Sequence, residues 1–166
     1  MDITRKICDL FDSNSVEYKL LTHPETLTSE ASRNARIEHG AEDVVGAKAL
    51  VIKTTLKTGE IEYNVFVLPG NKKLNSKAIK RYLNVKSISF ATAEILGELT
   101  GGLVPGSMPP FANAVFPELN CLFIDNSLLE QERIGFNAGS LRRSLIVNCS
   151  DYVQIANPKE IFDFAN

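Results

Sequence analysis

The stretch Thr100–Phe111, TGGLVPGSMPPF, combines three glycines with three prolines in twelve residues. Glycine reaches backbone conformations that are closed to other residues, and proline holds φ at about −65°. A loop of this composition has a fixed shape, and its amide N–H groups can point outward to cradle a carbonyl oxygen or an anion. The alternative is a sharp connection between two elements with no part in binding. The stretch therefore predicts either a rigid binding loop or a structural turn.

Three other patches accompany this loop. They are an apolar run that contains one lysine, a His-Pro pair followed by two hydroxyl residues, and a polar segment between two apolar ones: Ala47–Ile52 with Lys48, His23–Ser29, and Phe136–Ser140. In this order and spacing, the four patches resemble the YbaK/ProX family of aminoacyl-tRNA deacylases. These domains hydrolyse mischarged tRNA, either as free proteins or as the editing insert of bacterial prolyl-tRNA synthetase. The resemblance runs from about Val16 to Ile155, nearly the whole chain.

Length and hydrophobic patterning predict one α+β domain over residues 1–166. The chain is 44% hydrophobic and 23% charged, which is ordinary for a globular protein with a substantial core. Two β-rich runs, 48–56 and 61–68, flank a Lys-Thr-Gly-Glu turn and predict a hairpin, and helical segments lie between the strands. The resemblance implies a mixed β-sheet, partly closed into a barrel and flanked by helices.

The remaining elements follow from periodicity and from capping residues. We expect helices from Ile3 to Phe11, from a Thr28 or Ser29 cap to Gly40, over Ser76–Leu83, from a Thr92 cap through Leu99, and after Pro158. We expect further strands at 16–20, 85–90, 120–124, 134–136 and 145–148.

Charge and cysteine usage limit the partners and the compartment. A net charge of −2 excludes a global basic field, so a nucleic-acid partner needs a local patch. Six cations between Lys72 and Lys86 could follow the phosphates of a tRNA acceptor stem, or they could be a solvated helix face. No apolar run approaches the roughly 20 residues of a membrane span, and no signal-peptide core is present. Three scattered cysteines predict a reducing cytoplasm, with no disulfide, no metal and no cofactor.

Three residues are the predicted catalytic groups. Lys48 matches the lysine that is central to the family's active site, where a cation suits a ribose hydroxyl, a phosphate or the substrate carbonyl. Its alternative is a lysine at a strand edge, with its head in water. Gly101 and Gly106 match glycines of the family's loop, and we expect their N–H groups to stabilise the oxyanion of ester hydrolysis. Ala112 stands where the family usually has glycine, which leaves the substrate subtype open.

The resemblance further indicates substrate-binding residues: His23, Thr28, Ser107, Pro110, Phe111, Asn137, Gly139 and Ser140. From the residues alone, His23 is either a general base or a loop histidine that hydrogen-bonds backbone. Thr28 is a helix cap first and a pocket wall second. No Ser-His-Asp or Cys-His set is evident, so we expect a reaction in which the ribose 2′-hydroxyl of the substrate helps to place or activate water.

These observations predict a trans-acting deacylase. It would hydrolyse the ester of tRNA mischarged with a small amino acid, on tRNA-Pro, with the acceptor end of aminoacyl-tRNA and prolyl-tRNA synthetase as partners. One alternative is a non-catalytic module of the same fold that binds tRNA or a synthetase. Another is a small-molecule ester or amide hydrolase. The sequence does not reveal which aminoacyl group is removed, because small side chains differ by only about 1–3 kcal/mol in pocket contacts.

Overall fold

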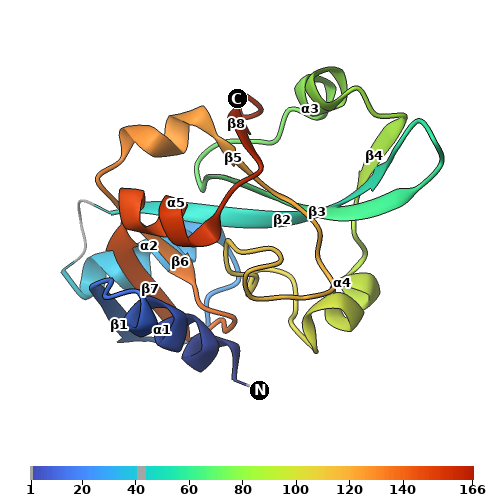
Figure 1. Cartoon of the computed structure of the whole chain (residues 1–166). Coiled ribbons are helices and arrows are strands. Elements are labelled where there is room, and N and C mark those ends of the chain that lie inside the picture. The colour runs from blue at the N-terminus through green and yellow to red at the C-terminus, as the bar shows by residue number, and fades with distance from the viewer. Residues whose placement is uncertain (1, 41–43) are drawn as a thin grey trace.

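The computed structural model describes residues 2–40 and 44–166, which form one eight-stranded mixed sheet flanked by helices (Figure 1). The helices are α1 (Ile3–Ser13), α2 (Ser29–Glu38), α3 (Ser76–Leu83), α4 (Ala93–Thr100) and α5 (Cys149–Ala156), with a 3₁₀ turn η1 (Asn126–Glu130). The strands are β1 (Tyr18–Thr22), β2 (Val45–Thr55), β3 (Ile61–Pro69), β4 (Ser87–Phe90), β5 (Leu122–Asp125), β6 (Arg133–Asn137), β7 (Arg143–Asn148) and β8 (Glu160–Phe162). The predicted mixed sheet with flanking helices is confirmed.

Strand β2 joins the two halves of the sheet. The strand order is β1-β7-β6-β2-β3-β5-β8, and β4 pairs with the far end of β2. The start of β2 pairs in parallel with β6 at Val45 and Gly46, whereas Ile52–Thr55 pair with β4. Figure 1 shows the resulting shape, in which the β2–β3 hairpin extends beyond the body of the molecule and carries β4 along its side. One strand therefore serves a compact half at its start and a projecting arm at its end.

The Gly/Pro loop is anchored in the larger hydrophobic core. Phe111 is fully buried, and its ring centroid lies 5.5 Å from that of Tyr152 and 5.9 Å from that of Phe136. The Tyr152 hydroxyl also donates a 2.6 Å hydrogen bond to the carbonyl oxygen of Pro110. Burying one such aromatic side chain stabilises a fold by about 1.5–3 kcal/mol, so these contacts hold the end of the loop in one position.

Local capping signals placed most helix ends correctly. Thr28 accepts a hydrogen bond from the N–H of Ala31 at the start of α2, and Thr92 does the same for Ile95 at the start of α4. The stop at Gly40 is also confirmed, with a φ of 83°. Among the described residues, no helix has both the length and the apolar character needed to cross a membrane.

The helix expected after Pro158 is wrong. Helix α5 lies before that proline, because the Asn148 side chain caps its start by accepting from the N–H of Ser150. Asn157 ends α5 in the left-handed conformation, with a φ of 52°. The residues after Pro158 then form β8, which pairs in parallel with β5. The proline follows the helix end, as prolines often do, rather than starting a new helix.

Candidate active site

A pocket of about 170 Å³ lies where α2, the start of β2 and the Gly/Pro loop meet. Figure 1 shows α2 beside the part of β2 that pairs with β6. Three groups of residues line the pocket, namely residues at and before α2, residues of β2, and single residues from β3, the loop and β6: Leu27, Thr28, Ser29, Ser32, Arg36, Gly46, Ala47, Lys48, Ala49, Leu50, Gly70, Gly106, Met108 and Asn137. Segments that are up to 110 positions apart in the chain, from Leu27 to Asn137, thus share one cavity.

Lys48 is half-buried on β2 and lines this pocket. Burial lowers the pKa of its amine, and the positive charge of Lys73 lowers it further. The lining includes no aspartate or glutamate, so no carboxylate in the cavity wall neutralises the lysine. Lys53, farther along the same strand, does not line the pocket. The predicted contrast between these two lysines therefore has a geometric basis.

Gly106 brings the loop to the pocket. Its φ of 89° is a conformation that side chains with a Cβ rarely adopt, which accounts for glycine here. Its carbonyl oxygen accepts a 2.7 Å hydrogen bond from Asn137 Nδ2, whereas its N–H donates to no acceptor among the described residues. A backbone donor of this kind can stabilise an oxyanion, so the residue suits the predicted role.

Gly101 lies elsewhere and serves a different purpose. It caps the end of α4 with a φ of 76°, and its N–H is bonded to the carbonyl oxygen of Gly97. It does not line the pocket, and nothing lies within 4 Å of the place that a Cβ would occupy. Because the amide is already bonded, the structure speaks against Gly101 as an oxyanion donor, and the helix end explains the glycine.

Several other predicted binding residues support the loop rather than the cavity. The buried Ser107 hydroxyl donates to the carbonyl oxygen of Val104 and closes the loop on itself. Pro110 and Phe111 anchor the loop to the core, as described above. None of these three predicted residues lines the pocket, so the structure does not bring them to it.

The predicted residues after β6 divide in the same way. Asn137 lines the pocket. Gly139 instead packs against α1, where an added Cβ would lie 2.7 Å from side-chain atoms of Ile3. The hydroxyl of Ser140 accepts from the N–H of Arg142 and shapes the turn into β7. Of this segment, only Asn137 reaches the cavity.

His23 is buried behind the pocket, with 5% of its surface exposed. Its Nδ1 lies 2.8 Å from the carbonyl oxygen of Pro24, so this nitrogen is the donor, and its Nε2 lies 2.8 Å from the hydroxyl of Ser144. Ser144 in turn contacts Asn137 at 3.4 Å. The histidine thus binds backbone, as one of its two interpretations held, and it reaches the cavity only through two other side chains.

Arg36 is a residue of the site that sequence analysis missed. It lines the pocket and is only 4% exposed, and its Nε and Nη1 have no hydrogen-bond partner among the described residues. Burial lowers the pKa of its guanidinium to about 10, so it remains charged at neutral pH. The helical pattern placed Ala35 and Ile37 on the inner side of α2, and nothing in that pattern distinguished this arginine from a solvated one.

The remaining chemical groups add no second site. Burial raises the pKa of the Cys149 thiol, whose sulfur contacts the carbonyl oxygen of Leu128, so this cysteine is a buried apolar side chain as expected. Asp125 caps η1 through the N–H of Ser127 and accepts from the N–H of Phe164. Across residues 2–40 and 44–166, His, Cys, Asp and Glu side chains form no group of three that could hold a metal ion.

Comparisons with known proteins agree with this fold and site. Residues 23–155 match the model of the aminoacyl-tRNA editing domain. The multifunctional Ser/Thr-tRNA deacylase ProXp-y of Escherichia coli (strain K12) is 30% identical over 156 residues, which are 93% of this chain and 89% of that protein.

Solved structures show the same fold. A candidate trans-editing enzyme for prolyl tRNA synthetase superposes with a TM-score of 0.76 at 20% identity, covering 100% of this chain and 98% of that one. A hypothetical protein superposes with a TM-score of 0.78 at 23% identity, covering 97% and 99% of the two chains.

The chain belongs to the aminoacyl-tRNA editing domain family. The resemblance seen in the sequence is therefore confirmed, and with it the class of enzyme, an aminoacyl-tRNA editing hydrolase.

Proposed function

We propose that this protein hydrolyses the ester of mischarged aminoacyl-tRNA in trans, with Lys48 and the N–H of Gly106 acting on the ester. The observation that carries the proposal is that the pocket joins these two groups, one a cation and the other an unbonded backbone donor, in a cavity whose lining has no carboxylate. Both favour negative charge on the ester oxygen as the transition state forms.

The reaction would proceed by addition of water to the ester. The water oxygen bonds to the carbonyl carbon, the bond from that carbon to the ribose oxygen breaks, and a proton from water ends on the ribose oxygen. The pocket lining contains no histidine, cysteine, aspartate or glutamate to serve as a general base. This composition supports a substrate-assisted reaction, in which the neighbouring ribose hydroxyl places or activates the water and the protein supplies position and charge.

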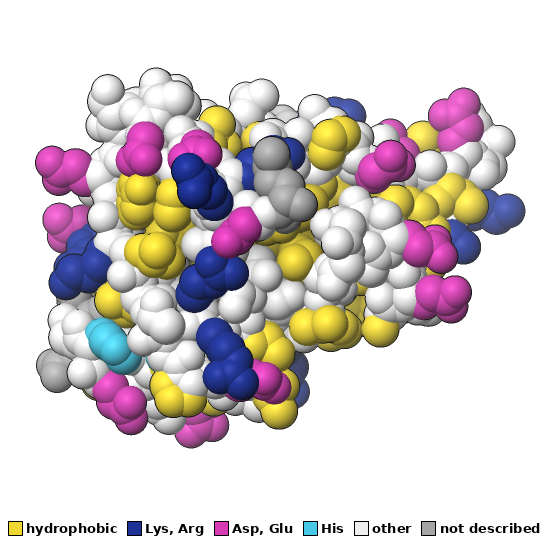
Figure 2. Space-filling model, turned by 90° about the horizontal axis from the view of Figure 1, so that it is seen from below, with side chains coloured by type: hydrophobic (Ala, Val, Ile, Leu, Met, Phe, Trp, Pro, Cys, Tyr) yellow, Lys and Arg dark blue, Asp and Glu magenta, His cyan; other side chains and the backbone are white. Residues whose placement is uncertain are grey.

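We propose serine and threonine as the amino acids removed. ProXp-y, 30% identical to this chain, carries Ser/Thr-tRNA deacylase activity in its name, and the cavity of about 170 Å³ suits a small side chain. A tRNA-Pro acceptor end and a prolyl-tRNA synthetase partner, both expected from the resemblance, stay part of the proposal, as does action in the cytoplasm. The mixture of positive and negative side chains on the face drawn in Figure 2 leaves tRNA contact to local patches.

A deacylation screen tests the function. Purified protein is incubated with tRNA-Pro, tRNA-Ser, tRNA-Thr and tRNA-Ala carrying serine, threonine, alanine or proline, and loss of the ester is followed with time. Ester loss from seryl- or threonyl-tRNA above the rate without protein supports the proposal. Tight tRNA binding without turnover would instead support the non-catalytic module, and turnover of simple esters without tRNA would support a small-molecule hydrolase.

A further inference from the structure

The guanidinium of Arg36 lies at the bottom of the pocket without a partner among the described residues. A buried charge is normally paired or hydrogen-bonded, because an unpaired one is costly to remove from water. The other buried polar side chains around the pocket do have partners. Ser32 donates to Thr26, and Asn137 donates to Gly106. The lack of an acceptor at Arg36 is thus specific to this residue.

The fold makes room for this arginine with two glycines. Gly46 of β2 and Gly135 of β6 face each other in the parallel register. A Cβ on Gly46 would lie 3.0 Å from Arg36 Nη2, and one on Gly135 would lie 2.6 Å from Arg36 Cδ and 2.7 Å from Nε. Neither glycine has a positive φ, so the backbone does not require glycine at either position. Space for the arginine accounts for both, and the pocket floor is a built site.

Depth separates the two cations of the pocket. Lys48 is half-buried, whereas Arg36 is 4% exposed. A substrate that brings its ester to Lys48 and Gly106 therefore directs whatever is attached beyond the ester toward Arg36. In an aminoacyl-tRNA, that group is the amino-acid side chain, while the tRNA phosphates stay on the solvent side.

We propose that Arg36 determines specificity by donating a hydrogen bond to an oxygen of the aminoacyl side chain, the hydroxyl of serine or threonine. This inference rests on the proposed deacylase function and adds to it the residue that reads the amino acid. A side chain with an oxygen satisfies the unpaired guanidinium, whereas alanine leaves it buried and unsatisfied. Sites that expect a hydrogen-bonding group discriminate strongly against analogues that lack it.

The test compares the kcat/KM for seryl-tRNA with that for alanyl-tRNA, using the same tRNA for both. This ratio does not depend on the fraction of folded protein. Arg36→Met should lower the ratio by about 10- to 100-fold, the usual worth of a hydrogen bond to a charged group. Arg36→Lys should lower it less. The matched control is Arg33→Met, because Arg33 is an exposed arginine of the same helix that does not line the pocket.

A second variant keeps the arginine and removes its space. Gly46→Ala places a methyl group 3.0 Å from Arg36 Nη2 and should displace the guanidinium, so the same ratio should fall although Arg36 is present. This variant also keeps the proposal testable if Arg36→Met fails to fold.

Three results would overturn the proposal. Equal losses on seryl- and alanyl-tRNA would show that Arg36 does not read the side chain. If that equal loss vanished with 2′(3′)-O-seryl-adenosine, which lacks the terminal phosphate, the arginine would be a phosphate contact instead. Glu42 and Asp43 lie outside the described residues, so Glu42→Gln and Asp43→Asn complete the set. A fall in the ratio in either variant like that of Arg36→Met would indicate a partner within the chain.

Failure of the proposed function has a different signature. In that case the parent protein leaves every aminoacyl-tRNA intact, and no ratio can be measured. A parent that deacylates both substrates while its ratio is insensitive to Arg36 contradicts this inference alone.

Discussion

The two ends of β2 treat buried polar groups in opposite ways. At the far end, buried Asn64 donates to Thr54 at 3.1 Å and accepts from the N–H of Cys121 at 2.9 Å. At the near end, buried Arg36 and the N–H of Gly106 have no partner among the described residues. Satisfied polar groups stabilise a fold, whereas unsatisfied ones cost stability unless a ligand completes them. The difference locates function at the near end of the strand.

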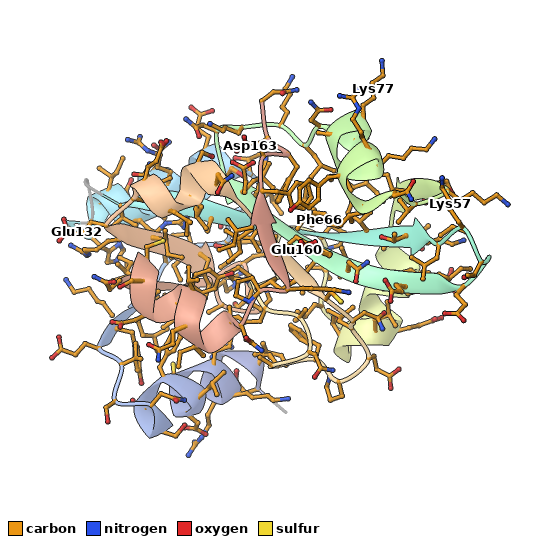
Figure 3. All side chains as sticks on the ribbon, turned by 45° about the horizontal axis from the view of Figure 1, so that its top comes forward. Lys57, Phe66, Lys77, Glu132, Glu160 and Asp163 are labelled. Atoms are coloured by element: carbon orange, nitrogen blue, oxygen red, sulfur yellow. The ribbon has the colours of Figure 1, made fainter. Side chains whose placement is uncertain are left out.

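The surroundings of the two ends differ in the same sense. The far end leads into an aromatic cluster in which Phe66 stacks on Phe123 with ring centroids 5.0 Å apart, and Figure 3 shows Phe66 inside the fold. Lys77, on the neighbouring helix α3, projects into solvent in the same view. The near end instead opens into a cavity lined by glycines and small polar residues.

The largest effect on function should come from Lys48. Lys48→Ala removes the half-buried cation of the pocket and should lower the rate of ester cleavage by about 10²–10³, the usual cost of one transition-state donor. Lys53→Ala, on the same strand but outside the pocket, should be mild. Single-turnover deacylation at saturating enzyme measures both. Parental activity in Lys48→Ala would remove this residue from the mechanism.

The next effect separates the two glycines of the loop. Gly106→Val should slow the chemical step by at least about 10² while tRNA binding is largely kept, because a side chain there displaces the donor. Gly101→Val should instead lower the melting temperature, since a residue with a Cβ in the left-handed region costs about 1–2 kcal/mol. Thermal denaturation and single-turnover kinetics are run on the same preparations. If the folded fraction of Gly106→Val turned over at the parental rate, the loop would be scaffold only.

A smaller effect, on stability, compares the two buried polar residues directly. Asn64→Ala leaves Thr54 and the N–H of Cys121 without their partner and should lower the free energy of unfolding by about 1–3 kcal/mol. Arg36→Met removes a buried charge without a described partner and should leave that free energy unchanged or raise it. Urea denaturation measures both. A loss at Arg36 as large as that at Asn64 would contradict the comparison.

Removal of metal should have no effect. The described residues show no group of His, Cys, Asp and Glu that could hold an ion, and the proposed chemistry uses a lysine and a backbone donor. Deacylation after dialysis against EDTA should equal that of the untreated protein. Stoichiometric metal by elemental analysis, with activity lost on its removal and regained on its return, would refute this prediction.

Sequence reasoning reached those parts of the molecule whose signals are local. Thr28 and Thr92 predicted helix starts because a capping hydroxyl acts within three residues, and the Gly/Pro loop announced its rigid shape by composition. The order of α5 and β8 was missed because Asn148 and Pro158 each allow more than one local structure. Lys48, Gly106, Thr28 and Asn137 were found through the family pattern, and the structure places all four around the pocket.

Arg36 could not be found in this way. Its burial depends on Gly46 and Gly135, which are 89 positions apart and meet only through the parallel pairing of β2 with β6. The sequence shows two ordinary glycines and a helical arginine. The roles given to Gly101 and Gly139 failed for a related reason, since a positive φ accounts for a glycine equally well at a helix end and in a pocket.

The hydrogen bond from Tyr152 to Pro110 has a consequence for the order in which the protein matures. The loop is synthesised first, but its anchor lies 42 residues farther on, in the last helix. A nascent chain that has reached only the end of β7 already contains Lys48 and Gly106, yet it lacks the side chain that holds the loop against the core. We therefore expect editing capacity to appear late in translation, when α5 has left the ribosome and the loop is fixed beside the finished sheet.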